Sequence, residues 1–540
     1  MKKTIYTFLL FFCTLTALAG QSELIRIYTD KDCYLAGEKM WIKLSLDEQA
    51  SPENRMSTVA YVEISDETQI HAQAKISLRE GSGWACIALP ASMHSGVYRL
   101  MTYTRYMRNW DASCYPQKFL AVVNARTHGE DDKLQAEPVE DISRLSEVST
   151  SDMGLESSRS SYGIREKVTL KWPEAWADAR ELVLSVVRKD CQVSLPQSPE
   201  PVSPVVASGE KWVAECEGHI VTARSRDAKK AVPAGLSVQL GCVGKELRVF
   251  EGVPKEDNTY RFYTDGVVGQ QDVVLVATHE EGENCQLEVM SPFVEQLPLS
   301  LPNLQLIYQE KAMEDWSVSV QVNQAIPPFP SLKPMKETLF GQQPTKTYNL
   351  DEYVRFSTVQ ECITEFVMGI TVNKENGRKV IRQLQEDSKD YNMFPVLVLI
   401  DGVPFDNHED VIVYSAKRLH YIHQYRGNYA MGEKIYGGVL SLITHTGTLP
   451  DIRIPQNMQM LAYEFPQDHP SFVAPAYPTD EKKLSRRPDL RHTLYWHPSM
   501  QGQVQAEFYT SDMEGTYIAT LQGISVEGEK ITATCCFEVK

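Results

Sequence analysis

Short runs in which apolar and polar side chains alternate recur along almost the whole chain, separated by turns rich in Gly, Pro, Asn and Asp. In the run 39–44, for example, Met40, Ile42 and Leu44 occupy every second position. A strand has a side-chain period of two, so this pattern predicts one buried and one solvated face. A length of 540 residues corresponds to about three or four domains. We therefore predict a mainly β, multi-domain chain of antiparallel β-sandwiches with one small α+β domain.

The strand-like runs divide the chain into segments. Residues 22–125 carry enough strands for a complete sandwich, whereas 126–157 is a polar stretch that we interpret as a linker. Residues 158–195 supply too few strands to close a core, and four more strand-like runs lie at 485–540. We predict that 158–195 and 485–540 form one discontinuous sandwich. The region between them is predicted to hold two inserted modules: a small β-module at 214–293 and the α+β domain at 345–448.

Residues 1–20 have the parts of a secretory signal peptide: the basic pair Lys2-Lys3, an apolar stretch, and the small-x-small site at 17–19. The apolar stretch is shorter than a membrane-spanning helix, and no later stretch is long and apolar enough for one. We therefore expect an exported chain with no transmembrane span after signal cleavage. Loss of Lys2 and Lys3 takes the formal net charge from −17 to −19. This charge disfavours nucleic acid as a partner, because nucleic-acid binding requires a basic face.

The chain has eleven cysteines, of which Cys13 leaves with the signal peptide. The spacing of the others indicates no connectivity, and the lack of a CxxC pair or a Cys/His quartet disfavours a structural zinc site. We expect most of these cysteines to be small buried side chains. An oxidising compartment would allow one or two disulfides among them.

A family resemblance is specific at two places. The first is carried by Tyr28-Thr29-Asp30-Lys31, Tyr34, Gly37-Glu38, Trp41 and the run 95–100, Ser-Gly-Val-Tyr-Arg-Leu. It resembles the macroglobulin-type sandwich, which occurs in α2-macroglobulins and in many exported proteins of Bacteroidetes. The second is the run 493–498, Thr-Leu-Tyr-Trp-His-Pro, which is similar to the later part of a macroglobulin domain.

The inserted modules resemble two further families. Residues 396–405 read Val-Leu-Val-Leu-Ile-Asp-Gly-Val-Pro-Phe, and 435–444 read Ile-Tyr-Gly-Gly-Val-Leu-Ser-Leu-Ile-Thr. A helix is predicted before them, with Ser357 as N-cap and Gln360 completing a capping box. This order resembles the plug domain of TonB-dependent outer-membrane receptors, here expected to lack the transmembrane barrel of a receptor. The strand order in 214–293 resembles the carboxypeptidase-regulatory-like sandwich, a module without a peptidase site.

Taken together, the chain resembles Bacteroidetes exported proteins that combine these modules. The resemblance implies a non-enzymatic interaction or scaffold protein, periplasmic or associated with the outer membrane. Such a protein could be accessory to an outer-membrane transport or secretion system, with envelope or outer-membrane proteins as partners. Recognition is usually carried by loops. The expected partner-binding residues are Asp401, Gly402, Val403, Pro404, Arg426, Asn428 and Tyr429.

The sequence contains no GxSxG, HExxH, P-loop or GxGxxG motif in a suitable context, so we predict no enzyme, no catalytic residue and no cofactor. His420 and His423 have a spacing that could place two imidazoles on one helical face for a metal ion. Neither a carboxylate nor a third ligand is apparent beside them, so no metal site is predicted.

Two other functions stay open at this point. A macroglobulin-like protease inhibitor would use the Pro/Ser-rich stretch 194–208 as bait, but without the Cys-Gly-Glu-Gln thioester motif, which the chain lacks. A carbohydrate-binding accessory protein would need exposed aromatic side chains, such as Trp110 or Trp496, to form a flat platform.

Overall fold

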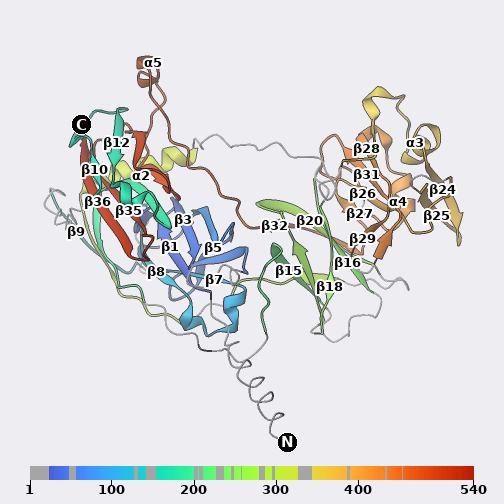
Figure 1. Cartoon of the computed structure of the whole chain (residues 1–540), viewed down its shortest axis with the longest axis horizontal. Coiled ribbons are helices and arrows are strands. Elements are labelled where there is room, and N and C mark those ends of the chain that lie inside the picture. The colour runs from blue at the N-terminus through green and yellow to red at the C-terminus, as the bar shows by residue number, and fades with distance from the viewer. Residues whose placement is uncertain are drawn as a thin grey trace, which may run out of the picture. The chain divides into compact units, whose positions relative to one another are not determined.

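A computed structural model shows a chain built mostly of antiparallel strands with few helices, so the predicted mainly β fold is confirmed (Figure 1). The residues described are 23–540 except 48–55, 127–131, 141–153, 200–204, 206–210, 227–235, 245–247, 257, 279–285, 295–297, 326–342, 386–388, 432–433 and 453. The predicted signal peptide lies outside them. In the described part, no helix is long and apolar enough to cross a membrane.

The chain divides into two compact units. Unit 1 comprises Met1–Cys216, Glu295–Pro330 and Gln467–Lys540, and unit 2 comprises Glu217–Val294 and Ser331–Pro466. Each unit is therefore assembled from segments that are far apart in the sequence.

The first sandwich of unit 1 has two sheets. One contains β1 (Ile25–Thr29), β3 (Lys39–Leu46) and β6 (Ser82–Ala88); the other contains β2 (Cys33–Leu35), β8 (Gln117–Val123), β7 (Gly96–Thr104), β4 (Val59–Ser65) and β5 (Ile70–Ser77). Met40, Ile42 and Leu44 of β3 are fully buried, as their alternation predicts. Two 3-10 turns, η2 (Tyr106–Asn109) and η3 (Ala112–Cys114), connect β7 to β8.

The second sandwich of unit 1 combines strands from both ends of the inserted region. One sheet contains β10 (Glu156–Ser157), β12 (Lys167–Lys171) and β34 (Gln505–Tyr509); the other contains β11 (Ser161–Tyr162), β36 (Lys530–Val539), β35 (Gly515–Ile524), β13 (Glu181–Arg188) and β33 (Thr493–His497). In Figure 1 the red strand β36 lies beside the teal strand β10 of the other sheet. Leu184, Leu494 and Leu521 are fully buried in one core, so the segments 158–195 and 485–540 both contribute to it.

A third sheet and a helix complete unit 1. They comprise β9 (Leu134–Pro138), β22 (Leu304–Tyr308), β14 (Cys191–Ser194) and α2 (Glu310–Ala325). β9 lies within the segment interpreted as a linker and pairs in parallel with β22, Leu134 opposite Leu304. Leu304 and Trp316 pack against Val97 and Ala121 of the first sandwich, so the helix and sheet cover one of its faces. The short elements η5 (Glu174–Trp176) and α5 (Asp480–Lys483) also belong to this unit.

Unit 2 begins with a small sandwich. Its sheets contain β18 (Val253–Pro254), β19 (Thr259–Thr264), β15 (His219–Ser225) and β21 (Leu287–Val289), and β17 (Val249–Glu251), β16 (Ser237–Cys242), β20 (Gln270–Thr278) and β32 (Met458–Glu464). Val221, Val238, Phe262 and Leu275 share its core. β32 follows the α+β part in the sequence and closes the edge beside β20, so the two parts of unit 2 are interleaved.

The α+β part of unit 2 is built on a five-stranded sheet. Its elements are β23 (Lys346–Asn349), β28 (Leu419–Tyr425), β31 (Val439–Thr444), β26 (Leu397–Ile400) and β27 (Val403–Pro404), the helices α3 (Val359–Glu365) and α4 (His408–Ile412), the turns η6 (Leu350–Glu352) and η7 (Ala416–Arg418), and the hairpins β24 (Ile370–Glu375) with β25 (Arg378–Gln383) and β29 (Tyr429–Met431) with β30 (Lys434–Tyr436). All four residues of β26 are buried, which accounts for the continuous apolar run.

The helix predicted from Ser357 begins one residue later. Thr358 is the N-cap of α3, and Glu361 completes the capping box. The prediction of Ser357 and Gln360 was therefore wrong by one position. The Glu361 carboxylate accepts from the backbone N–H of both Ser357 and Thr358, at 2.7 and 3.3 Å. A carboxylate satisfies these donors better than the Gln360 amide would, because the acceptor is charged.

Candidate functional site

The turn 401–404 connects β26 to β27. Asp401 and Gly402 both have positive φ, 45° and 80°, which is the conformation of a tight two-residue hairpin turn. The Asp401 carboxylate is fully buried and accepts three hydrogen bonds: from Thr444 N at 2.8 Å, Thr444 Oγ1 at 2.6 Å and Leu449 N at 2.9 Å. Its role in the structure is thus to fasten this turn to the end of β31.

The same turn packs against the sandwich of unit 2. Gly244 N donates to Asp401 O at 3.0 Å. A Cβ at Gly241 would approach Gly402 O to 2.8 Å and Pro404 Cδ to 2.9 Å, so the close approach needs glycine there. Asp401, Gly402, Val403 and Pro404 are all buried. These four predicted partner-binding residues therefore form an internal contact of unit 2 and offer no exposed side chain.

The second predicted loop, 426–429, lies at the other end of β28. Asn428 is exposed, whereas Arg426 and Tyr429 are partly buried. Arg426 Nη2 donates to Met368 O at 3.4 Å, and Asn392 Nδ2 donates to Asn428 Oδ1 at 2.8 Å. The loop is thereby held against the segment before β24 and the segment after β25.

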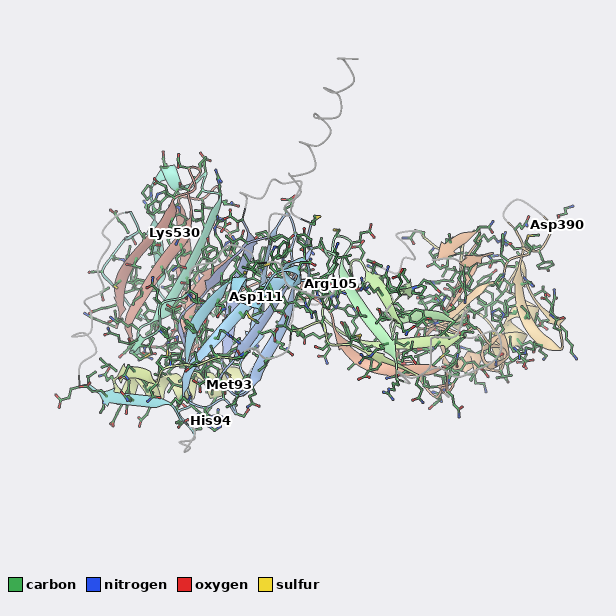
Figure 2. All side chains as sticks on the ribbon, turned by 90° about the horizontal axis from the view of Figure 1, so that it is seen from below. Met93, His94, Arg105, Asp111, Asp390 and Lys530 are labelled. Atoms are coloured by element: carbon green, nitrogen blue, oxygen red, sulfur yellow. The ribbon has the colours of Figure 1, made fainter. Side chains whose placement is uncertain are left out.

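Exposed apolar side chains surround this second loop. Met368, Tyr391 and Met393 are exposed by 60, 46 and 77%. Leu384 N donates to Gly369 O, and Leu384 forms a bridge with Tyr391, so these segments are neighbours. Figure 2 labels Asp390, which precedes Tyr391 and lies beside the β24–β25 hairpin at one end of unit 2. We call Met368, Tyr391, Met393, Arg426 and Asn428 the 426–429 surface.

The concentration of such side chains in this part of the chain is unusual. Among the described residues, eighteen large apolar side chains are exposed, and seven of them lie within 345–448, about a fifth of the chain. Single exposed apolar residues need no explanation, but grouped ones mark contact surfaces. Three of the seven, Met368, Tyr391 and Met393, belong to the 426–429 surface, which is therefore the best candidate for an interaction site. The loop is predictable from its turn residues, whereas no local pattern identifies Met368 and Met393 as exposed.

Unit 1 contains a buried polar network that has the residue types of a catalytic site. Lys31 Nζ lies 3.4 Å from His492 Nδ1, and His492 Nε2 lies 2.7 Å from Asp190 Oδ2. An ammonium group only donates, so Nδ1 is the acceptor and Nε2 carries the proton that faces Asp190. Burial lowers the pKa of His492, with the Lys31 charge acting in the same direction.

This network has no access for a substrate. Side chains of His492 and Asp190 are 5% and 1% exposed, and the Trp316 ring stacks on the imidazole at 4.2 Å. Lys31 also pairs with Glu38, which in turn accepts from Trp316 Nε1 at 3.3 Å. The arrangement joins α2 to both sandwiches of unit 1, and we interpret it as structural.

Unit 2 has a shallow depression on its surface. It has a volume of about 200 Å³ and is lined by residues that include Arg226, Leu275, Gln286 and Met458. Pockets for drug-sized ligands usually have about 300 to 1,000 Å³ and several converging polar groups. This depression is smaller than such pockets, although amide side chains line its wall beside Arg226.

His420 and His423 lie on the strand β28, not on a helix. The helical face assumed for this pair therefore does not exist, and His420 is the extra residue where the register of the strand shifts. His423 is buried. His420 instead lies beside Asp351 and His445, two residues that sequence spacing does not connect with it.

No protein-family model matches this chain, and no curated protein sequence matches it. Among solved structures, a native α2-macroglobulin of E. coli matches with a TM-score of 0.23 and 9% identity, covering 97% of this chain and 40% of that one. The same protein activated by porcine elastase gives 0.23 and 9%, with 96% and 44% covered. FdeC, an E. coli adhesin, gives 0.15 and 10%, with 53% and 65% covered. The chain thus spans about two fifths of the length of the macroglobulin it matches.

Proposed function

We propose that the protein is a non-enzymatic interaction or scaffold protein of the cell envelope, which binds an envelope or outer-membrane protein through the 426–429 surface. The observation that supports this is the exposure of Met368, Tyr391 and Met393 around a loop that carries Arg426. Exposed methionine and aromatic side chains beside an arginine have the composition of protein-binding surfaces.

The proposal includes the assignments that the sequence resemblances imply. The sandwich at 22–125 and the discontinuous one at 158–195 and 485–540 would be macroglobulin-type domains, with a carboxypeptidase-regulatory-like module at 214–293 and a plug-like domain at 345–448. The protein would be exported, with the plug-like domain serving for contact. The partner would come from the periplasm or the outer membrane, for example from a transport or secretion system.

The carbohydrate-binding alternative loses the aromatic side chains it relied on. Trp110 is 7% exposed and Trp496 is 1% exposed. The Trp496 ring packs on Trp41 at 5.1 Å, so it belongs to the contact between the two sandwiches of unit 1. Neither indole can form a platform for a sugar. For the protease-inhibitor alternative, much of the stretch 194–208 lies outside the described residues.

Site-specific photo-crosslinking in the native host tests the proposal. A photoreactive side chain at position 393 is expected to give an adduct with a periplasmic or outer-membrane protein. The matched control is position 526, because Val526 is also an exposed apolar residue but lies in unit 1. Met393→Glu combined with Tyr391→Ser should weaken recovery of the same partner at least tenfold, because a charge enters an apolar contact.

Two results would contradict the proposal. One is recovery of the protein in the cytoplasmic fraction. The other is equal crosslinking at positions 393 and 526, which would mean that the 426–429 surface has no preference for a partner.

A further inference from the structure

A β-bulge places His420 where it lies. In the antiparallel pair β28–β31, Leu419 is opposite Thr444 and Tyr421 is opposite Ile443, so His420 is the extra residue of the bulge. His445 directly follows β31, and its N–H donates to Arg418 O at 3.1 Å. Bulges redirect a side chain relative to the regular ladder, and they occur preferentially beside functional sites. Here the bulge brings two imidazoles from neighbouring strands to the same end of the sheet.

The two rings lie parallel. Their centroids are 5.0 Å apart, with 19° between the ring planes. The third group comes from the next strand in the sheet: β23 ends at Asn349, and Asp351 follows in η6. Asn349 Oδ1 accepts from Asp351 N at 3.2 Å, which fixes the backbone of Asp351.

The metal-binding atoms of the three side chains lie close together. His420 Nε2 lies 3.5 Å from Asp351 Oδ2, and His445 Nε2 lies 3.9 Å from Asp351 Oδ1. One ligand atom from each residue lies within 4.8 Å of the others. Zinc–nitrogen and zinc–oxygen bonds of about 2.0 to 2.2 Å in a tetrahedral site place the ligand atoms about 3.3 to 3.6 Å apart, so these atoms must approach one another by at most about 1.5 Å. Such a movement is small for side chains that are partly exposed.

Arg355 is the competing occupant. Its guanidinium pairs with Asp351, and its Nη2 lies 3.5 Å from His445 Nε2. A metal ion at this point must therefore displace a cation from the carboxylate. Arg355 Nη1 also donates to Leu419 O at 2.9 Å, which gives the guanidinium an anchor on the strand. The competition predicts modest affinity that rises when the guanidinium is removed.

We propose that Asp351, His420 and His445 form a binding site for a zinc-like divalent transition-metal ion. Two imidazoles and one carboxylate make a donor set that suits Zn²⁺, Ni²⁺ or Cu²⁺ rather than Mg²⁺ or Ca²⁺. With three protein ligands on a partly exposed surface, the fourth position is open to water or to a group of another molecule. The proposal is independent of the 426–429 surface and of the function assigned to it.

Zinc titration of the mature full-length chain, without a histidine tag, tests the site. A chromophoric chelator competes for Zn²⁺, and the melting temperature is followed with and without Zn²⁺, because a ligand that binds only the folded state stabilises it. Wild type is expected to bind one Zn²⁺ per chain. His420→Asn and Asp351→Asn should each weaken binding at least tenfold. Arg355→Gln should tighten it several-fold.

His94→Asn is the matched control. His94, labelled in Figure 2, is a partly exposed histidine whose Nδ1 lies 3.8 Å from Asp132 Oδ1, so it forms a similar His–carboxylate pair without a second imidazole. This variant should bind Zn²⁺ like wild type. The proposal is overturned if wild type takes no Zn²⁺ from the competitor. It is also overturned if the His420 and Asp351 variants bind as tightly as wild type, or if the His94 variant alone loses binding.

Discussion

At the scale of single residues, the buried carboxylate of Asp401 fixes the turn between β26 and β27. Its Oδ1 and Oδ2 accept three hydrogen bonds from Thr444 and Leu449. The sequence shows an Asp-Gly pair, which predicts the turn but not the environment of the Asp side chain. Turn chemistry is local, whereas burial depends on β31 and on the sandwich strand β16 from elsewhere in the chain.

Asp401→Ala is expected to destabilise unit 2 by about 3 kcal/mol, because two backbone donors and a hydroxyl lose their acceptor inside the protein. All eight tryptophans lie in unit 1, so their fluorescence reports that unit alone. The substitution should therefore lower the urea midpoint seen by circular dichroism and leave the fluorescence midpoint unchanged. Asp390→Ala, at an exposed position, is the control. A wild-type circular-dichroism curve for Asp401→Ala would show that the three hydrogen bonds contribute little.

The buried His492 predicts a pH dependence of unit 1. Its pKa lies below the ordinary value of 6.5 in the folded state. As the pH falls, the unfolded chain therefore binds a proton at His492 before the folded chain does, and this favours unfolding. Stability contributed by neutral His492 is present above pH 6.5 and is lost as the pH falls through the folded pKa. Asp30 has the opposite effect. Burial raises its pKa from 3.8 to about 6, so its contribution to the stability of the fold is present below pH 3.8 and is lost as the pH rises to about 6.

Comparison with His492→Gln separates the two groups. The difference in unfolding free energy between wild type and variant should be constant above about pH 7.5 and should shrink as the pH is lowered to about 5. Lys31, Glu38, Asp190 and Arg188 surround His492 or its partners and are present in both proteins. Urea unfolding followed by tryptophan fluorescence measures the difference, with His94→Gln as control. A constant difference over this range would mean that His492 does not titrate differently on unfolding.

At the scale of elements, the sequence predicts strands with a clear local period and misses those that depend on distant partners. β9 lies in a polar stretch and is a strand because β22, far along the chain, pairs with it. In α2 the local pattern favours a strand although the segment is a helix, because Val318, Val320 and Val322 occupy alternate positions. Yet the buried residues of α2 follow the spacing of a helix face: Ala312, Met313, Trp316, Ser319 and Val320. The segment is a helix because this spacing lets its apolar side chains pack against the first sandwich.

Cys33 of β2 and Cys191 of β14 join two such elements. Their Sγ atoms lie 3.5 Å apart, and the hydrogen bond between them, together with burial, raises the pKa of the Cys33 thiol well above its usual range. A high pKa makes exchange at the folded Cys33 thiol slow. In an oxidising compartment we expect this pair to form a disulfide during folding, by exchange with an oxidised disulfide donor that is released as two thiols.

The crosslink should stabilise unit 1. In the loop-closure model a disulfide that closes about 160 residues removes up to about 5 kcal/mol of chain entropy from the unfolded state. Peptide mapping without reductant should find the 33–191 crosslink in protein folded with oxidised glutathione, and reduction should lower the fluorescence-detected urea midpoint. Cys33→Ser should abolish the effect of reductant, whereas Cys86→Ser should not. Free thiols at both positions after oxidative folding would refute this pairing.

At the scale of the whole molecule, one carboxylate of the second sandwich accepts hydrogen bonds from three side chains of the first. Glu181 of β13 accepts from Arg26 Nη1 at 3.0 Å, Tyr28 OH at 2.7 Å and Ser45 Oγ at 2.8 Å, and it is buried. From sequence, the shortage of strands in 158–195 indicated that distant strands must complete its sheets. No sequence pattern indicated that Glu181 is buried and hydrogen-bonded, because an isolated Glu in a strand usually faces solvent.

Removal of residues 485–540 is therefore expected to unfold the second sandwich and not merely to shorten it. The deletion takes β33, β34, β35 and β36, which leaves β13 without either neighbour. Trp172, buried and donating from Nε1 to Gln503 O at 2.9 Å, would become solvated. We expect a red shift of tryptophan emission, loss of part of the β signal in circular dichroism, and rapid proteolysis within 158–195.

A cut in place of a deletion provides the control. Leu484 is 81% exposed, so a specific protease site inserted there can be cleaved in the folded protein. The two pieces should stay associated, with unchanged emission, because β12–β34 and β13–β35 still hold them together. Supplying 485–540 as a separate chain should likewise restore the truncated protein. If the chain ending at 484 keeps wild-type emission and protease resistance, residues 158–195 fold without their distant strands, and the discontinuous sandwich is not needed for stability.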